Sequence, residues 1–348
     1  MTLSIKLLQP NTFDAWDRFV IQHPDGTFCH RAGWKTVVEK GAGHVGRFLF
    51  AERDGAIVGV LPLSIRRSRL FGNAVISNMF GVYGGPLAVE DEALKALDCE
   101  AQKLMKSVGG DFLEYRTRVA RHTNMQGWYE KPPSAATFIK ELKGETDDEL
   151  LTAIPRKQRA VVRKSLSKGL STDWNGDLET FYHLYSQSVR NLGTPVFGKK
   201  LFKTMLHAFP EDVLVQVTCD AHGRPAASLF SFLHNDTVLP YYAGGGPLAR
   251  QLHAHEFMYY DLMKKAVSLG KNTFDFGRSK IDSGPYKFKK NWGFDPQPLH
   301  YEYFLPEGGG LPDHSPQNPR YQAMISVWKR LPLWLANRLG PPIARHLG

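Results

Sequence analysis

Cysteine is scarce in this sequence, and the few residues present are far apart. Cys29, Cys99 and Cys219 are odd in number and include no C-x-x-C pair. A disulfide framework requires paired cysteines and a structural zinc site requires closely spaced ligands, so the pattern indicates neither. Scattered, unpaired thiols are typical of a reducing compartment, and we expect a cytoplasmic protein.

Long apolar runs and clusters of metal ligands are missing as well. No stretch approaches the roughly 20 apolar residues of a membrane-spanning helix, and Met1 to Trp16 lacks the basic start and apolar centre of a signal peptide. On a helix, the two-residue spacing of His253 and His255 would turn their rings to different faces, and no third ligand is nearby. We therefore predict a soluble protein with no metal site.

Acidic residues are outnumbered by basic ones. The chain has 348 residues, with 44 Lys and Arg against 34 Asp and Glu, which gives a formal net charge of +10. This excess favours contact with phosphates, nucleic acid or an anionic membrane face. The hydrophobic content of 42% is sufficient for one large core or two ordinary ones, and we expect two domains.

Two segments of the sequence repeat the same order of predicted elements: three strands, a glycine-containing loop, a helix and a closing strand. In the first segment these strands and the helix cover residues 47–51, 56–65, 73–80, 92–107 and 111–116. In the second they cover residues 213–219, 226–234, 238–243, 255–268 and 272–276. Both loops contain the string GGPLA, at 84–88 and at 245–249, and we infer an internal duplication.

Further motifs mark the second half of the chain and its tail. They are IPRKQR at 154–159, GTPVF at 193–197, DFGRSK at 275–280, FKKNWGF at 288–294 and NPRY at 318–321. Together with the segment from Phe28 to Trp34, they resemble the FemAB-like proteins, which are Fem peptidyltransferase relatives in the GNAT acyltransferase superfamily. The resemblance is specifically to the FemAB-related group associated with exosortase (PEP-CTERM) and exopolysaccharide gene clusters.

This resemblance implies a fold class and a domain division. The fold would be α+β (mixed α/β), with two tandem GNAT-like domains at residues 1–145 and 146–305, the second holding the active site. Residues 306–348 would form a linker rich in Pro and Gly and an amphipathic tail of short helices, broken by Pro332 and by Pro341-Pro342. This tail would pack on the protein body or dock peripherally on the inner membrane surface.

The resemblance also implies an activity. The protein would transfer an acyl or aminoacyl group and form an amide bond on an amine-bearing sugar or peptide, in cell-envelope or exopolysaccharide assembly. Two alternatives stay open at this point. One is a CoA-dependent GNAT N-acetyltransferase, and the other is a non-catalytic module of the same fold that binds a sugar or peptide.

One loop bears on the donor. CoA-dependent GNAT enzymes hold the pyrophosphate with a Q/R-x-x-G-x-G/A loop at a helix N-terminus. At the corresponding place this chain has Leu252, His253 and Ala254. Aminoacyl-tRNA is then the favoured donor, with acyl-CoA as the alternative, because a net basic chain suits tRNA through phosphate neutralisation. We expect no DNA partner and identify no other cofactor.

The DFGRSK motif and the segment after it supply the candidate catalytic residues. By its match to the Fem motif, Lys289 would stabilise the transferred acyl carbonyl. Arg278, at a strand end, would hold a phosphate or carboxylate. Asp275 would orient Arg278, accept a proton from the amine or only cap its own turn. Candidate substrate-binding residues are Ser279, Tyr286, Lys287, Phe288, Tyr241 and Tyr242, and core packing is the alternative for the tyrosines.

A predicted helix from about Ile154 to Lys168 carries many like charges. Val162, Leu166 and Leu170 would form its buried stripe. The candidates for binding a phosphate of tRNA, of a nucleotide-sugar or of a lipid headgroup are Arg156, Lys157, Arg159, Arg163 and Lys164. The alternative is a solvated helix that only links the two domains.

Overall fold

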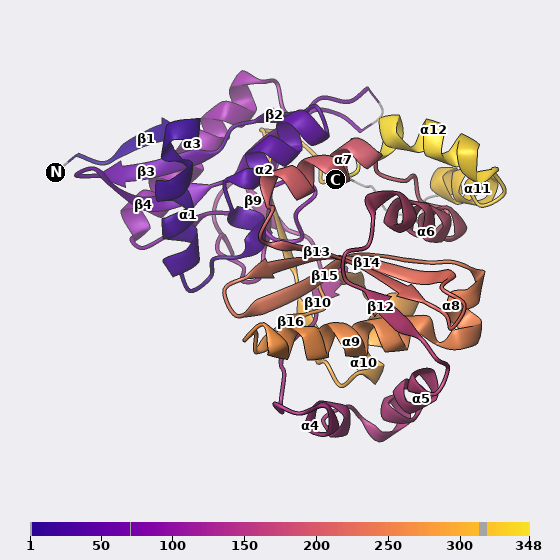
Figure 1. The fold of residues 1–348 in the computed structure, drawn as a ribbon. Helices are drawn as coiled ribbons and strands as arrows, with labels where there is room; N and C mark the ends of the chain where they lie inside the picture. Colours follow the sequence, from indigo (N-terminus) through magenta and orange to yellow (C-terminus); the bar gives the residue numbers. More distant parts are fainter. Residues whose placement is uncertain (1, 70, 313–318) are drawn as a thin grey trace.

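The computed structural model describes residues 2–69, 71–312 and 319–348, with the side chains of residues 319–323 excepted. Two units that each combine β-sheet with helices lie side by side, and the C-terminal helices lie beside α6 of the second unit (Figure 1). Pro316 and Asn318, which belong to the predicted linker and the NPRY motif, are outside the described residues.

The first unit contains two sheets. One has the order β1-β3-β4-β7, formed by Ser4–Leu7, Leu49–Arg53, Ala56–Leu61 and Leu87–Ala88. The other has the order β2-β5-β6-β8-β19-β9, formed by Val45–Gly46, Leu63–Arg66, Ala74–Ser77, Phe112–Thr117, His300–Phe304 and Trp128–Glu130. Pro62 separates β4 from β5 and splits the strand predicted at 56–65, because proline cannot donate to a strand ladder. The helices are α1 (Phe13–Gln22), α2 (Gly33–Thr36) and α3 (Asp91–Ser107).

The second unit has one six-stranded sheet, with α6 (Leu178–Leu192) on one face and α9 (Ala254–Ser268) on the other (Figure 1). Its order is β11-β16-β15-β14-β13-β12, formed by Ile139–Glu141, Thr273–Asp275, Thr237–Gly245, Pro225–His234, Val213–Cys219 and Ser171–Asp173. The other helices are α4 (Asp147–Thr152), α5 (Arg156–Leu166), α7 (Lys199–Ala208), α8 (Pro247–Leu252) and α10 (Gly284–Asn291). A small sheet, β17-β10-β18, is formed by Ser279–Lys280, Ala135–Thr137 and Gln297–Pro298.

The predicted duplication is confirmed by the strand pairing. In the first unit, β6 runs parallel to β8, and α3 lies between them in the chain. In the second unit, β15 runs parallel to β16, and α8 and α9 lie between them. In both units the preceding strands form an antiparallel meander. The same meander followed by the same parallel crossover therefore occurs twice.

The two units exchange strands, which corrects the predicted boundaries. β19 pairs antiparallel with β8 and β9, so residues 300–304 belong to a sheet of the first unit. β11 pairs with β16, so residues 139–141 belong to the sheet of the second. The sheets thus do not divide at residues 145 and 305. A strand that pairs far away in the sequence carries no local signal of its partner, so the exchange was not predictable from pattern.

The units also share one hydrophobic core. The ring of Phe28, in the first unit, stacks on that of Phe232 in β14, with ring centroids 4.1 Å apart. Trp34 lies next to the same phenylalanine and to Phe209, and all four residues are buried. Since aromatic side chains bury large apolar areas, this contact holds the two units as one body.

The tail packs on the protein body, as the first of the two alternatives expects. α11 (Pro319–Trp328) and α12 (Leu333–Ala344) follow one another, and α12 contacts α6. Farther along, Arg345 Nη2 donates to the carbonyl of Gly43 over 2.8 Å, so the tail spans both units. Pro332 separates the helices as predicted, but Pro341 and Pro342 lie inside α12. The Pro341 ring lies beside Gly198, which has no side chain to obstruct it.

Candidate active site

The turn after β16 is built by an aspartate and a glycine. Gly277 has a φ of +67°, a backbone conformation that side-chain-bearing residues rarely adopt. Its N–H donates to Asp275 Oδ1 over 2.8 Å, so the carboxylate caps its own turn. Phe274 and Phe276, on either side of Asp275, are buried in the aromatic core and fix the strand end. The turn is therefore rigidly placed.

Asp275 joins the two units. Its side chain is buried, with 3% exposed, and it accepts a hydrogen bond of 2.7 Å from the Tyr83 hydroxyl of the first unit. Thr137 Oγ1 donates to it over 3.1 Å. Burial raises the pKa of Asp275, and these donors oppose the rise because they favour the carboxylate. With its lone pairs engaged by three donors, Asp275 serves as an anchor between units.

Lys289 points from α10 towards the same turn. Its Nζ donates to the carbonyls of Gly277 over 2.9 Å and Arg278 over 3.2 Å. The ammonium also lies over the rings of Phe138 and Phe276, with its nitrogen 5.5 and 5.9 Å from their centroids. Burial lowers the pKa of Lys289 to about 7, although the Asp275 charge acts in the opposite direction. A lysine that exchanges its proton near neutrality is a group able to serve in catalysis.

Arg278 is turned away from Asp275, contrary to the expected pairing. Its side chain is exposed, and its Nε donates to the Tyr301 hydroxyl over 2.5 Å. The guanidinium carbon also lies 5.7 Å from the centroid of the Tyr301 ring. Tyr301 is in β19, so this contact again links the units. Other donors already bind the Asp275 carboxylate. Arg278 therefore lies on the solvent side of the turn, where it donates to Tyr301.

The other residues predicted to bind substrate fall into different environments. Ser279 is buried, and its hydroxyl has no partner among the described residues. Lys287 is exposed on α10. Tyr286 is half-buried and meets Phe138 edge-on at 5.2 Å, whereas Phe288 packs into the core beside Tyr259. Of the predicted set, only Asp275 and Lys289 lie around the turn with their polar atoms directed towards it.

The two tyrosines of β15 have structural roles. The Tyr241 hydroxyl donates to the carbonyl of Phe80 over 2.8 Å and accepts from the N–H of Val82 over 2.7 Å, so it ties β15 to a loop of the first unit. Tyr242 is buried against Tyr185 and Phe202. Both contacts agree with the core-packing alternative for these tyrosines.

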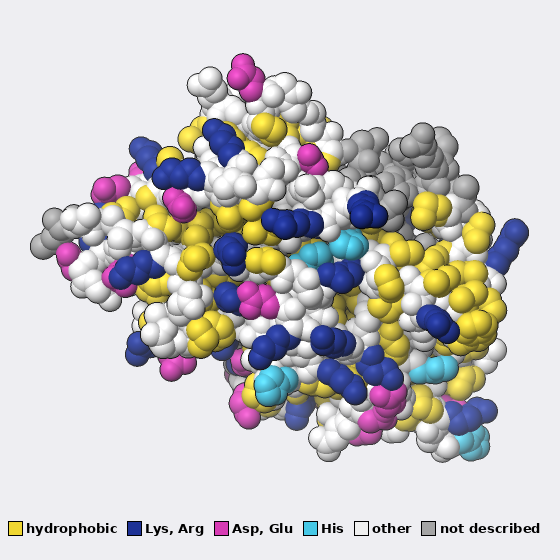
Figure 2. Space-filling model, turned by 90° about the horizontal axis from the view of Figure 1, so that it is seen from above, with side chains coloured by type: hydrophobic (Ala, Val, Ile, Leu, Met, Phe, Trp, Pro, Cys, Tyr) yellow, Lys and Arg dark blue, Asp and Glu magenta, His cyan; other side chains and the backbone are white. Residues whose placement is uncertain are grey.

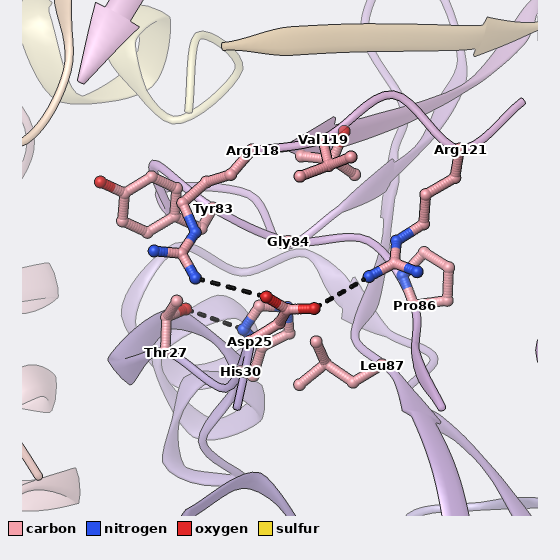
Figure 3. A pocket seen from close by; sticks show the side chains of 11 residues that line it. Asp25, Thr27, His30, Tyr83, Gly84, Pro86, Leu87, Arg118, Val119 and Arg121 are labelled. Carbon is pink, nitrogen blue, oxygen red and sulfur yellow. Dashed lines mark hydrogen bonds and ion pairs between the residues drawn. The ribbon is translucent and has the colours of Figure 1, made fainter. Parts of the chain in front are cut away.

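A small, partly open pocket lies in the first unit next to Tyr83 (Figure 3). His30 is buried in its wall, with Nδ1 2.7 Å from Thr27 Oγ1 and Nε2 without a partner among the described residues. Burial lowers the pKa of His30 to about 3, so the ring is neutral. Arg118 and Arg121 line the pocket and pair with Asp25, at 3.7 and 3.2 Å.

Tyr83 connects this pocket to the turn. Its ring lines the pocket below Arg118, whose guanidinium carbon is 5.8 Å from the ring centroid, and its hydroxyl bonds to Asp275. Sequence reasoning missed Tyr83, His30 and both arginines as site residues. The one available signal was the position of Tyr83 directly before the repeated glycine loop.

Comparison with known proteins places this geometry in a known fold. Residues 156–290 match the family described as Acetyltransferase (GNAT) domain. The chain is similar to the crystal structure of FemX, with a TM-score of 0.67 and 17% identity; the match covers 92% of this chain and 100% of that chain. The chain has a FemAB-like tandem GNAT fold.

Two other solved structures match over most of the chain. A tandem GNAT protein from the clavulanic acid biosynthesis pathway matches with a TM-score of 0.55 and 12% identity, over 87% of this chain and 98% of that chain. L-PGS from Bacillus licheniformis matches with a TM-score of 0.56 and 11% identity, over 93% and 97%. At these identities the likeness concerns the fold alone. No curated protein sequence matches this chain.

The place where a GNAT pyrophosphate loop would lie is filled by a helix. α8 ends at Leu252, and α9 begins at Ala254, so one residue separates them. That residue, His253, has a φ of +54°, and the ring of His255 packs against Gly245. In the first turn of α9, Ala254 and Phe257 are buried, and His255 and Glu256 are partly buried. The structure therefore agrees with the sequence, which has Leu252, His253 and Ala254 in place of the Gly-x-Gly of a pyrophosphate loop.

The basic helix α5 presents most of its charges outward. Arg156, Lys157, Arg163 and Lys164 are exposed. Arg159 is different, because it donates to the carbonyls of Thr152 and Ile154 and so stabilises the link between α4 and α5. Val162 is buried as expected, whereas Leu166 is 40% exposed at the helix end, which shortens the predicted stripe. Within the described residues, no His, Cys, Asp and Glu group is arranged to hold a metal ion.

Proposed function

We propose that this protein is an acyltransferase that forms an amide bond between an acyl or aminoacyl donor and an amine. The observation that carries the proposal is Lys289, whose pKa lies near 7 and whose Nζ is held at the turn that Asp275 anchors to the pocket of the first unit. The match of residues 156–290 to an acetyltransferase domain supports the reaction class.

The role proposed for Lys289 is to stabilise charge. When the amine nitrogen attacks the carbonyl carbon of an ester, a C–N bond forms and the carbonyl oxygen becomes negative. Protonated Lys289 donates to that oxygen. The C–O bond then breaks, and the proton lost by the amine ends on the leaving oxygen. Aminolysis of an ester is accelerated mainly by alignment and charge stabilisation, so no separate general base is required.

For the donor, we propose aminoacyl-tRNA in preference to acyl-CoA. The helix α8 and His253 directly before α9 replace the expected Gly-x-Gly loop, which disfavours a pyrophosphate there. Exposed cations on α5 (Arg156, Lys157, Arg163) suit a polyanion. A CoA-dependent N-acetyltransferase stays the alternative within the same fold, and a non-catalytic binding module is the alternative outside enzymes.

For the acceptor, we propose an amine-bearing sugar or peptide of cell-envelope or exopolysaccharide assembly. The pocket beside Tyr83 offers a neutral His30 and two arginines, which together can hold hydroxyl, carbonyl and carboxylate groups. Tyr83, which lines this pocket, also donates to Asp275. The exosortase-associated context rests on the sequence resemblance.

Calorimetric titration distinguishes the donors. Acetyl-CoA is expected not to bind at millimolar concentration, whereas charged tRNA is expected to bind with an affinity that falls as salt is raised. A double variant, Arg156→Gln with Arg163→Gln, should weaken tRNA binding and reduce the salt dependence. Micromolar affinity for acetyl-CoA would instead favour the CoA-dependent alternative.

A further inference from the structure

The tail helices and the end of α6 expose a group of large apolar side chains. We call it the tail surface, and its members are Leu192, Met324, Val327, Trp334 and Leu339. Trp334 is 67% exposed, the highest fraction among the large hydrophobic residues that the structure describes. At this exposure Trp334 buries little apolar area against the protein. A cluster of large exposed apolar side chains marks an interaction surface.

These side chains come from elements that contact one another. Gly193, directly after Leu192, lies against Ile325 and Lys329 of the α11 region. Arg190 of α6 donates to the carbonyl of Leu331 over 3.2 Å, which places the turn between α11 and α12 beside α6. In Figure 2, hydrophobic side chains gather on the right of the molecule, in the area of the C-terminal helices.

Trp334 faces away from the body because of its position on α12. The buried residues of that helix are Ala336, Gly340 and Ala344, four residues apart, which form a single stripe packed on the protein. Trp334 and Arg338 are also four residues apart, and both are exposed on the side opposite to that stripe. An outward tryptophan and an outward arginine therefore occupy one face of the helix.

Charge at the tail surface has one sign. Residues 319–348 contain no Asp or Glu. Lys329, Arg330 and Arg338 are exposed, and none of them forms an ion pair with any residue within the described ranges. An apolar centre bordered by cations is the chemistry of a helix that lies in the interface of an anionic bilayer.

We propose that the tail surface binds peripherally to a phospholipid bilayer that contains anionic headgroups. Trp334 and its apolar neighbours enter the headgroup and acyl boundary, while Lys329, Arg330 and Arg338 face the lipid phosphates. A second copy of the chain fits less well, since two such surfaces would bring like charges together. No described helix is long and apolar enough to cross a membrane, so the contact is one of surface binding. The proposal does not depend on the proposed transferase activity.

Vesicle sedimentation tests the proposal with the full chain. Wild-type protein is expected to pellet with vesicles of phosphatidylcholine and phosphatidylglycerol and to stay in the supernatant with pure phosphatidylcholine. In Trp334→Glu, the affinity for the mixed vesicles should fall by on the order of tenfold or more. Val89→Glu is the matched control, because Val89 is 66% exposed in the first unit, and it should bind as wild type.

Two further measurements keep the outcome clear. Tryptophan emission should shift to shorter wavelength when mixed vesicles are added, and Trp334→Phe should remove most of that shift. Equal pelleting of wild type and Trp334→Glu would overturn the proposal. So would failure of both to pellet, together with a wild-type dimer in solution that Trp334→Glu converts to a monomer, since that result assigns the surface to a second copy.

Discussion

The hydroxyl of Tyr83 donates a hydrogen bond of 2.7 Å to the carboxylate of Asp275, across the junction of the two units. This bond couples the pocket of the first unit to the turn that holds Lys289 in the second. Because both partners are buried, neither can replace the other with water when it is removed. The stability of the fold and the geometry of the proposed site therefore both depend on this hydrogen bond.

Tyr83→Phe tests this coupling. Loss of the donor should lower the free energy of unfolding by about 1–3 kcal/mol, because Asp275 stays buried with one bond fewer. Urea denaturation measures the change. If Tyr83 and Asp275 interact directly, the double variant of Tyr83→Phe and Asp275→Asn loses less free energy of unfolding than the sum of the two single variants.

A matched control for that variant is Tyr115→Phe. The Tyr115 hydroxyl is also buried and donates to a carboxylate, that of Asp98, over 3.0 Å, but it lies outside the pocket and the turn. It should reduce stability to a similar degree and leave transfer unaffected. If Tyr83→Phe lowers transfer and Tyr115→Phe lowers it to the same degree, the loss comes from general destabilisation.

Lys289→Met tests the catalytic role. Removing the donor to the carbonyl oxygen is expected to lower kcat by a factor of about 10² to 10³. The fold should persist, since the methionine can occupy the same space between Phe138 and Phe276 and no longer carries a charge that burial disfavours. Circular dichroism and a melting curve check the fold beside the kinetic assay.

Two neighbours on α10 serve as controls for Lys289. Lys287→Met and Lys290→Met remove exposed cations of the same helix and should retain wild-type kcat. A uniform decrease in all three variants would show that the helix contributes only general positive charge, for example to polyanion binding. That result would separate a role in donor affinity from one in the chemical step.

The pH dependence of kcat/KM follows from the same lysine. With a pKa of about 7, Lys289 is protonated below that pH and neutral above it. If the protonated form stabilises the oxyanion, kcat/KM falls as the pH rises through about 7, while protonation of the attacking amine limits the acid side. A rate that instead rises through pH 7 and needs neutral Lys289 would make this residue a base.

Stability should depend on pH through His122. Burial opposes protonation of this imidazole, but its bonds to Asp98 and Glu302 outweigh that effect and raise its pKa to about 9. Because the folded state holds the proton more tightly, the contribution is complete below pH 6.5 and is lost as the pH rises through about 9. We expect the free energy of unfolding to decrease by about 2–3 kcal/mol over this range. His122→Gln should lack the decrease, and an unchanged slope in it would contradict the assignment.

Much of the fold could be predicted from the sequence, because it depends on local patterns. Both copies of the duplicated unit were recognised from local patterns. These were the alternation of apolar residues along 213–219 and the helices predicted at the same place in each copy, 92–107 and 255–268. The exchange of β11 and β19 could not be predicted, since pairing between residues 113 and 304 depends on the assembled sheet.

The site was predictable only in part. Asp275 and Lys289 stand in two neighbouring motifs, DFGRSK and FKKNWGF, and the structure places both at one turn. The direction of Arg278 depends on Tyr301, a residue of the exchanged strand, and so was inaccessible to local reasoning. The pocket residues come from two segments far apart in the sequence, His30 from the turn of helix at Phe28–His30 and Arg118 and Arg121 from the loop after β8, and only the folded chain brings them together.

Transfer to a generic amine is the measurement that tests the central claim most directly. Purified protein would be incubated with charged total tRNA and hydroxylamine, and formation of aminoacyl hydroxamate would be followed for wild type, Lys289→Met and Lys287→Met. The account predicts hydroxamate formation above the uncatalysed rate with wild type and Lys287→Met, and its loss with Lys289→Met. Equal rates with wild type and Lys289→Met would contradict the account.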